Sequence, residues 1–343
     1  MKRIPSVPPR RRGGWQSWLA ALLGGAGAAA PSTAAEGPPV APAPSPGARP
    51  ASAPSDTAVA TPAAAPAVAP SALSRAGMVV YKTADGSKLK MHFARPDPQK
   101  FPGPRPCVVF FHGGAWRSGD PKQFMAYAEK LAEVGVIGVS AQYRLLQDGD
   151  VLPMNAVRDA RSALRYLRSK GAQLGCDVQR IGAGGGSSGG HLAAMAAVSI
   201  SPPAVAGKPA APNALDDPSD DPSVSPRPQA LFLMNPPLNL ERFERPVPAE
   251  QRRQLSPTLL MDASLPPTWI FHGTADKVVP FSQVTEFRDR ARSLGAGEVT
   301  VQAFPGRGHG FFNAKRGDGG DFDATVTGIY NGLKKLGWID AKP

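Results

Sequence analysis

The stretch Gly184–His191 constrains the fold of this chain more than any other segment. It reads GGGSSGGH, follows a short apolar run at 179–183 and precedes an alanine-rich run at 192–198. A serine on a sharp turn between a strand and a helix has a strained backbone, and its neighbours need almost no side chain. The stretch therefore predicts a strand, a tight turn that presents a serine, and a helix, in that order.

The beginning of the chain has the composition of an export signal. Lys2, Arg3 and the arginines at 10–12 precede a small apolar stretch at 18–30, and small residues follow it. This order is typical of a signal peptide, and the apolar stretch is shorter than the about 20 residues of a spanning helix. We expect a signal peptide over 1–35, and hence a periplasmic or secreted protein with no stable membrane insertion.

The rest of the chain divides into a linker and one large domain. Residues 36–75 are rich in Ala, Pro, Ser and Val and almost uncharged, which predicts a semi-extended linker. Residues 76–343 are enough for one domain with a sizeable core.

Five positive charges of the net +12 lie before residue 13, and removing them leaves about +7. No basic run is interleaved with aromatic residues, so we expect no nucleic-acid partner.

The two cysteines do not indicate a metal site. Cys107 lies in an apolar run at 105–111 that predicts a buried strand, whereas Cys176 lies in an expected loop. Their spacing does not decide whether they form a disulfide in an exported protein. Because the sequence has no cluster of the zinc-binding type, we expect no metal.

Strand and helix patterns alternate along the expected domain. An Asp-Gly pair at 85–86 between two strand-like runs predicts a hairpin. Further strands are expected at 105–111, 136–142, 179–183, 229–234, 268–272 and 298–304, and helices at 121–134, 155–170, 192–198, 281–294 and 322–336. Such alternation predicts an α/β fold with a mostly parallel sheet, helices on both faces and a site at the carboxyl ends of the strands.

Two polar regions interrupt this pattern. The expected helix at 155–170 has an apolar stripe with arginines on its other face. Residues 201–228 are rich in Pro, Asp, Ser and Ala, and we expect an exposed insertion or a mobile lid there.

A serine nucleophile needs a base to take its proton and a carboxylate to hold that base. The pattern G-x-S-x-G fits twice, centred on Ser187 and on Ser188, so the pattern alone does not choose between them. Of the five histidines, His309 lies in a glycine-rich loop after an expected strand. Asp276 also follows a strand, whereas the rival carboxylate Asp262 precedes one.

From about residue 78 to 340 the chain resembles the α/β-hydrolase superfamily, and more closely the single-domain esterases that include acetyl xylan and feruloyl esterases. The motifs that carry the resemblance are FFHGGAW at 110–116, QYRL at 142–145, the GGGSSGGH stretch, PPTWIFHGTAD at 266–276 and GRGHGF at 306–311. The family order of nucleophile, acid and base implies Ser187, Asp276 and His309. The family motif G-x-S-A-G-G-H-L-A favours Ser187, with Ser188 where alanine is common.

The resemblance also implies an oxyanion hole. The His-Gly-Gly motif after a buried strand implies backbone N–H donors at Gly113 and Gly114, and the N–H of Ser188 completes the hole. His112 is then expected to shape the loop by hydrogen bonding. Trp116 either borders the acyl pocket or packs against the core.

These residues predict an exported serine hydrolase that cleaves carboxylic esters through an acyl-enzyme, without a cofactor. The expected substrates are small esters or acylated carbohydrates, such as acetylated xylan. An amidase of the kynurenine formamidase type is the alternative, because it uses the same triad and also has the HGG-x-W motif. A non-catalytic binding protein on this fold is disfavoured because no triad member is missing. The sequence does not define the oligomeric state.

Overall fold

The computed structural model describes residues 76–148, 150, 152–198, 213–243 and 248–340. The expected signal peptide at 1–35 and linker at 36–75 lie outside these residues, as does most of the first half of the 201–228 insertion.

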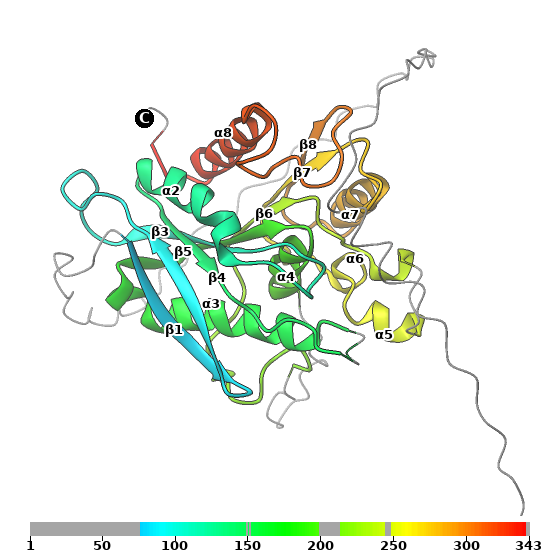
Figure 1. Ribbon diagram of the computed structural model, residues 1–343, viewed down its shortest axis with the longest axis horizontal. Helices are drawn as coiled ribbons and strands as arrows, with labels where there is room; N and C mark the ends of the chain where they lie inside the picture. Colours follow the sequence, from blue (N-terminus) through cyan, green and yellow to red (C-terminus); the bar gives the residue numbers. More distant parts are fainter. Residues whose placement is uncertain (1–75, 149, 151, 199–212, 244–247, 341–343) are drawn as a thin grey trace, which may run out of the picture. The chain divides into compact units, whose positions relative to one another are not determined.

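The described residues form an eight-stranded sheet with the strand order β1-β2-β4-β3-β5-β6-β7-β8 (Figure 1). The strands are β1 (Ala76–Ala84), β2 (Ser87–Ala94), β3 (Arg105–Phe111), β4 (Ile137–Ala141), β5 (Cys176–Gly186), β6 (Ala230–Met234), β7 (Thr268–Gly273) and β8 (Val299–Phe304). The β1–β2 hairpin and the β2–β4 pair are antiparallel, and the other pairs are parallel. The predicted hairpin and mostly parallel sheet are confirmed.

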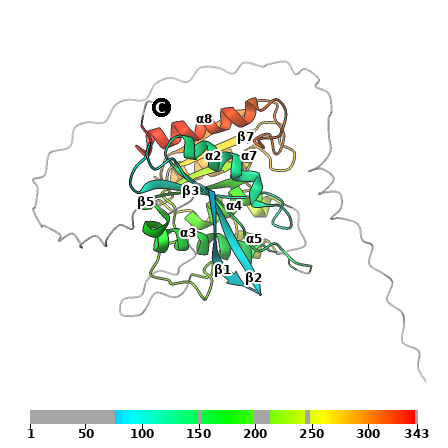
Figure 2. The same ribbon diagram turned by 60° about the vertical axis from the view of Figure 1, so that its left-hand side comes forward.

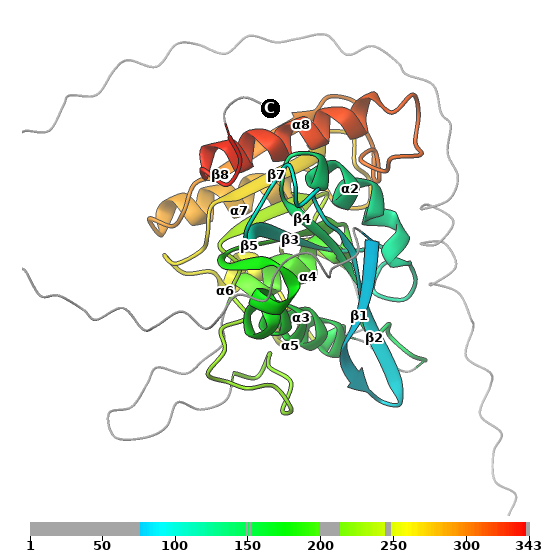
Figure 3. The same cartoon turned by 90° about the vertical axis from the view of Figure 1, so that its left-hand side faces the viewer.

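Helices cover both faces of this sheet. They are α2 (Met125–Glu133), α3 (Met154–Leu174), α4 (Ser188–Ala197), α5 (Ala249–Arg253), α6 (Pro257–Leu260), α7 (Ser282–Ser293) and α8 (Gly320–Lys335). Figures 2 and 3 show α2 and α8 on one side of the sheet and α3 and α4 on the other. Strands sandwiched in this way are buried on both faces, which explains why β3 is a continuous apolar run.

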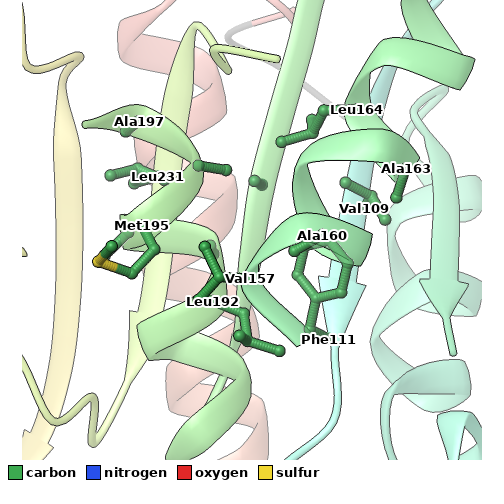
Figure 4. Packing of buried hydrophobic residues seen from close by; sticks show 14 of the residues in the cluster. Val109, Phe111, Val157, Ala160, Ala163, Leu164, Leu192, Met195, Ala197 and Leu231 are labelled. Atoms are coloured by element: carbon green, nitrogen blue, oxygen red, sulfur yellow. The ribbon is translucent and has the colours of Figure 1, made fainter. Parts of the chain in front are cut away.

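Alternate side chains of β3 supply the two cores. Val109 and Phe111 belong to the cluster beneath α3 and α4, whereas Val108 and Phe110 belong to the cluster beneath α2 and α8. The cause is the two-residue period of a strand, which sends successive side chains to opposite faces. Figure 4 shows the first cluster, in which Val109 and Phe111 lie among the apolar side chains of α3 and α4.

The expected loop position of Cys176 is wrong, because this residue opens β5 and is buried. The bulge between β3 and β5 places Cys176 opposite Arg105, two residues before Cys107. Both cysteines are free thiols. A hydrogen bond with Cys176, together with burial, raises the pKa of Cys107 well above its usual value.

The described part of the 201–228 insertion has exposed positions, as expected, but it is also anchored to α3. Residues 213–228 form no helix or strand, but Asp216 accepts hydrogen bonds from Arg161 at 2.6 Å and from Arg165 at 2.8 Å. Both arginines lie on the polar face of α3 and are nevertheless buried. A helical period locates the apolar stripe but cannot show that an acidic segment 50 residues further on covers the polar side.

Candidate active site

The turn between β5 and α4 has the strained geometry that the glycine-rich stretch predicts. Ser187 lies between the strand and the helix with φ 52° and ψ −121°. Positive φ is costly for a residue with a Cβ, and such strain persists only where the surroundings enforce it. A Cβ at Gly185 would lie 2.4 Å from the Phe111 carbonyl oxygen, and one at Gly189 would lie 2.0 Å from the same atom. Glycine at both positions therefore allows the turn to pack against the end of β3.

Three sequence-predicted residues meet at this turn in one hydrogen-bonded chain. His309 Nε2 lies 2.8 Å from Ser187 Oγ, and His309 Nδ1 lies 2.7 Å from Asp276 Oδ2. The other carboxylate oxygen, Asp276 Oδ1, accepts the backbone N–H groups of Val278 at 2.8 Å and Val279 at 2.9 Å. These bonds orient the carboxylate, which in turn orients the imidazole ring.

The rival residues lie elsewhere. Ser188 is the first residue of α4 and is buried, and its Oγ makes no hydrogen bond with His309. Asp262 accepts hydrogen bonds from Ser264 and Arg227 instead of from a histidine. The structure thus brings together Ser187, Asp276 and His309, and it leaves Ser188 and Asp262 outside this chain.

The topology explains why residues so far apart in sequence meet. Ser187 follows β5, Asp276 follows β7 and His309 follows β8. Parallel strands end at the same edge of a sheet, so loops after different strands converge there. The β5, β6, β7 and β8 strands are successive neighbours in the sheet.

The His-Gly-Gly loop lies beside the serine, as the sequence predicts, but its first glycine plays another part. A Cβ at Gly113 would lie 3.5 Å from Ser187 Cβ. The Gly113 N–H donates to Gln123 Oε1 at 2.7 Å, so this group already has an acceptor. That bond engages one of the two N–H groups that the His-Gly-Gly motif offers as oxyanion donors. In the part of the chain that the structure describes, the Gly114 N–H has no protein acceptor.

The backbone after Gly113 turns sharply. Gly114, Ala115 and Trp116 all have positive φ, at 125°, 52° and 61°. A Cβ at Gly114 would lie 2.1 Å from the Ser118 carbonyl oxygen, so only glycine fits there. On the opposite side of the site Ser188 begins α4, and the first N–H groups of a helix have no acceptor within it. The N–H groups of Gly114 and Ser188 thus have no protein acceptor among the described residues, and they stay candidates for the oxyanion donors.

Buried aromatic and imidazole rings support this loop. Trp116 is buried and packs edge-on against the His191 ring, with 5.1 Å between the ring centroids, so it belongs to the core. The Tyr143 hydroxyl donates to the His112 carbonyl oxygen at 2.9 Å, and the two rings stack. Burial lowers the pKa of His112, whose Nδ1 contacts the Gly113 carbonyl oxygen at 2.9 Å. These contacts agree with the expected loop-shaping part of His112.

Gln123 and Tyr143 are functional candidates that sequence reasoning missed. Tyr143 belongs to the QYRL motif, which marks it as a candidate without indicating its partner. Gln123 lies in a short 3-10 helix, and nothing in its sequence context distinguishes it from a surface glutamine. Only the tertiary contact with Gly113 reveals its position at the site.

Among the described residues, no group of three or more His, Cys, Asp or Glu side chains is arranged to hold a metal ion. Within the same ranges, none of the helices combines the length and the apolar character that crossing a membrane requires.

Comparison with known proteins places the chain in a family. Residues 96–211 match the BD-FAE family model. Esterase LipC of Mycobacterium tuberculosis is 28% identical over 225 residues, which are 61% of this chain and 53% of LipC. The chain spans about half the length of the curated relatives that it matches.

Solved structures match over nearly their whole length. Thermogutta terrifontis esterase 2 phosphorylated by paraoxon is 35% identical with a TM-score of 0.69, over 78% of this chain and 96% of that one. The butyrate-bound structure of this esterase is 34% identical with a TM-score of 0.69, over 78% and 97% of the two chains. The sheet order, the strained serine turn and these matches show that the chain belongs to the esterases of the α/β-hydrolase fold, a family of carboxylic ester hydrolases.

Proposed function

We propose that this protein hydrolyses carboxylic esters through an acyl-enzyme on Ser187, with His309 as the general base and Asp276 as the acid that orients it. The observation that carries the proposal is the continuous hydrogen-bonded chain from Ser187 Oγ through His309 to Asp276. Serine becomes a useful nucleophile when a base accepts its proton, and a buried carboxylate stabilises the imidazolium that forms.

The reaction follows from this geometry. Ser187 Oγ attacks the ester carbonyl while its proton passes to His309 Nε2. The negative charge that develops on the carbonyl oxygen is stabilised by the N–H groups of Gly114 and Ser188. His309 then gives the proton to the departing alcohol oxygen, and the C–O bond breaks to leave an acyl-serine. Water, deprotonated by His309, repeats the attack and releases the carboxylic acid.

We propose short acyl groups as the substrates, because the butyrate-bound and propionate-bound structures of Thermogutta terrifontis esterase 2 are close relatives in fold and sequence. Acetylated polysaccharides such as xylan remain our finer proposal, supported by the BD-FAE match and by the motifs that resemble acetyl xylan and feruloyl esterases. The named relatives are esterases, which does not favour the amidase alternative.

We also propose export to the periplasm or medium, on the composition of residues 1–35 alone.

The test compares the two adjacent serines. We expect Ser187→Ala to lower kcat for p-nitrophenyl butyrate by at least ~10³-fold, because removing the nucleophile removes the acyl-enzyme route. Ser188→Ala is the matched control, since it keeps the backbone N–H, and should retain kcat within about tenfold. A fluorophosphonate probe should label Ser187, as found by peptide mass spectrometry. Wild-type turnover in Ser187→Ala would refute the assignment.

The substrate class is tested on the same preparation. Release of acetate from acetylated xylan oligomers, measured beside hydrolysis of N-formylkynurenine, separates the esterase from the formamidase. We expect measurable turnover of the ester substrate only. Faster turnover of the formamide would contradict the proposal.

A further inference from the structure

Two carboxamide side chains connect the loop that carries the oxyanion donors with the loop that carries His309. Gln123 Oε1 accepts the Gly113 N–H at 2.7 Å, and Gln123 Nε2 donates to Asn313 Oδ1 at 2.7 Å. Asn313 Nδ2 then donates to the Gly310 carbonyl oxygen at 2.8 Å. Gly310 is the residue after His309, so the bridge runs from one side of Ser187 to the other.

The bridge permits only one arrangement of donors and acceptors. Its first member is a backbone N–H, which requires an acceptor, so Gln123 must present its oxygen there and its NH₂ to Asn313. Asn313 must then present its oxygen to Gln123 and its NH₂ to the Gly310 carbonyl, which can only accept. A carboxylate at position 123 or 313 has the same shape but no N–H group. One of its oxygens would therefore lie against another oxygen atom, without a hydrogen bond between them.

Both side chains are half-buried, and they adjoin aromatic rings that pack close to Gly186, the residue before Ser187. Gln123 lies next to the buried Phe124, which stacks on Phe312 with 6.1 Å between the ring centroids. Phe312 precedes Asn313, and its carbonyl oxygen accepts the Tyr127 hydroxyl at 2.6 Å. The rings hold the two segments together, and the carboxamide bridge determines how the polar backbone atoms face each other.

We propose that Gln123 and Asn313 are positioning residues. They fix the His-Gly-Gly loop at 112–114, which carries the oxyanion donor, relative to His309. This inference rests on the proposed function. The bridge gives the Gly113 N–H an acceptor, whereas the next N–H, that of Gly114, has no protein acceptor among the described residues and lies where the backbone turns sharply. A donor stabilises the transition state only when it is fixed where the charge develops, and small displacements weaken that effect strongly.

The test uses isosteric variants of the full-length protein, Gln123→Glu and Asn313→Asp. Each should lower kcat for p-nitrophenyl butyrate by about 10-fold to 100-fold, the range that a misplaced oxyanion donor gives, with KM within about threefold of wild type. The double variant should lose no more than the worse single variant, since both changes break one bridge. Gln99→Glu is the charge-matched control on an exposed residue, and it should leave both constants unchanged.

Several outcomes would overturn the inference. Wild-type kcat in both single variants refutes the bridge, as do additive losses in the double variant. A rise in KM equal to the fall in kcat, with a lowered unfolding temperature, shows a purely structural role. The two residues lie in separate segments, Gln123 in a short 3-10 helix and Asn313 in the loop after β8, so one variant suffices if the other does not fold. Activity that survives Ser187→Ala refutes the proposed function instead, whereas an inactive Ser187→Ala beside a fully active Gln123→Glu refutes the bridge alone.

Discussion

At the scale of single residues, two identical side chains next to each other have different surroundings. Ser187 has positive φ at the end of β5 and contacts His309, whereas Ser188 is the buried first residue of α4. The backbone changes direction at Ser187, between the strand and the helix. As a result, the Ser187 hydroxyl contacts His309, whereas the Ser188 hydroxyl is buried. A one-residue ambiguity in the sequence pattern thus becomes a large difference in chemistry.

Because two histidines are buried, we expect the free energy of unfolding to depend on pH. Burial lowers the pKa of His112 and of His272 below their usual value, and each ring contacts a backbone carbonyl. The unfolded chain then binds more protons than the folded one in mild acid. The stability that these histidines contribute is complete above their unfolded pKa of about 6.5, and it is lost as the pH falls toward the folded values.

We expect the free energy of unfolding in urea to fall between pH 7.5 and pH 5.5, by up to about 1.4 kcal/mol for each of the two histidines. The variant His272→Asn removes one of them, so its unfolding free energy should change less over the same interval. A pH dependence as steep in His272→Asn as in wild type would contradict this explanation.

At the scale of elements, the polar face of α3 is buried by another segment of the chain. Arg161 and Arg165 are buried beneath residues 213–228, where Asp216 bonds to both and Asp220 to the second. Burial alone would raise the pKa of Asp216, but the hydrogen bonds from Arg165 and Arg161 outweigh it and lower the pKa. The ionised Asp216 therefore anchors this irregular segment to the helix.

The variant Asp216→Asn tests this anchor. It should lower the free energy of unfolding by about 3 kcal/mol, because it leaves two buried guanidinium groups without their shared charge partner. Glu133→Gln is the matched control, since Glu133 pairs with Lys130 on the exposed surface of α2 and such pairs contribute about 0.5 kcal/mol or less. Equal small losses in both variants, measured by urea unfolding, would show that the buried network does not anchor the segment.

At the scale of the whole molecule, the two main cores and the site lie within the described residues of the unit Ala67–Pro343. Among the described residues, the first buried core residue is Tyr81 on β1. The hydrogen-bonded chain at Ser187 uses loops after β5, β7 and β8. We therefore expect a protein that starts at Ala67 to unfold in one cooperative transition and to hydrolyse p-nitrophenyl butyrate with kcat within about twofold of the full chain. Aggregation or a kcat lowered more than tenfold would show that the first 66 residues contribute to the fold or the site.

Local patterns in the sequence were sufficient to predict the alternating strands and helices and the serine turn, whereas Asp276 and His309 were expected from the family order of nucleophile, acid and base. The strands, the helices and the turn depend on short-range physics: strand and helix periods, and glycine where the backbone is strained. The order of the strands in the sheet was not predicted, because pairing between strands depends on contacts that are distant in the sequence.

Other features required the tertiary structure. The turn of the chain at Ser187 separated it from Ser188, and the contact with Gln123 gave the Gly113 N–H an acceptor. The burial of Arg161 against Asp216 was also unpredictable, because local periods carry no information on which distant segment covers a polar face. The glycine-rich stretch thus determined the kind of site by itself. The packing of the loops after separate strands decided which hydroxyl and N–H groups near this stretch contact the site. The reason is that hydrogen-bond partners depend on position in space and not on position in the sequence.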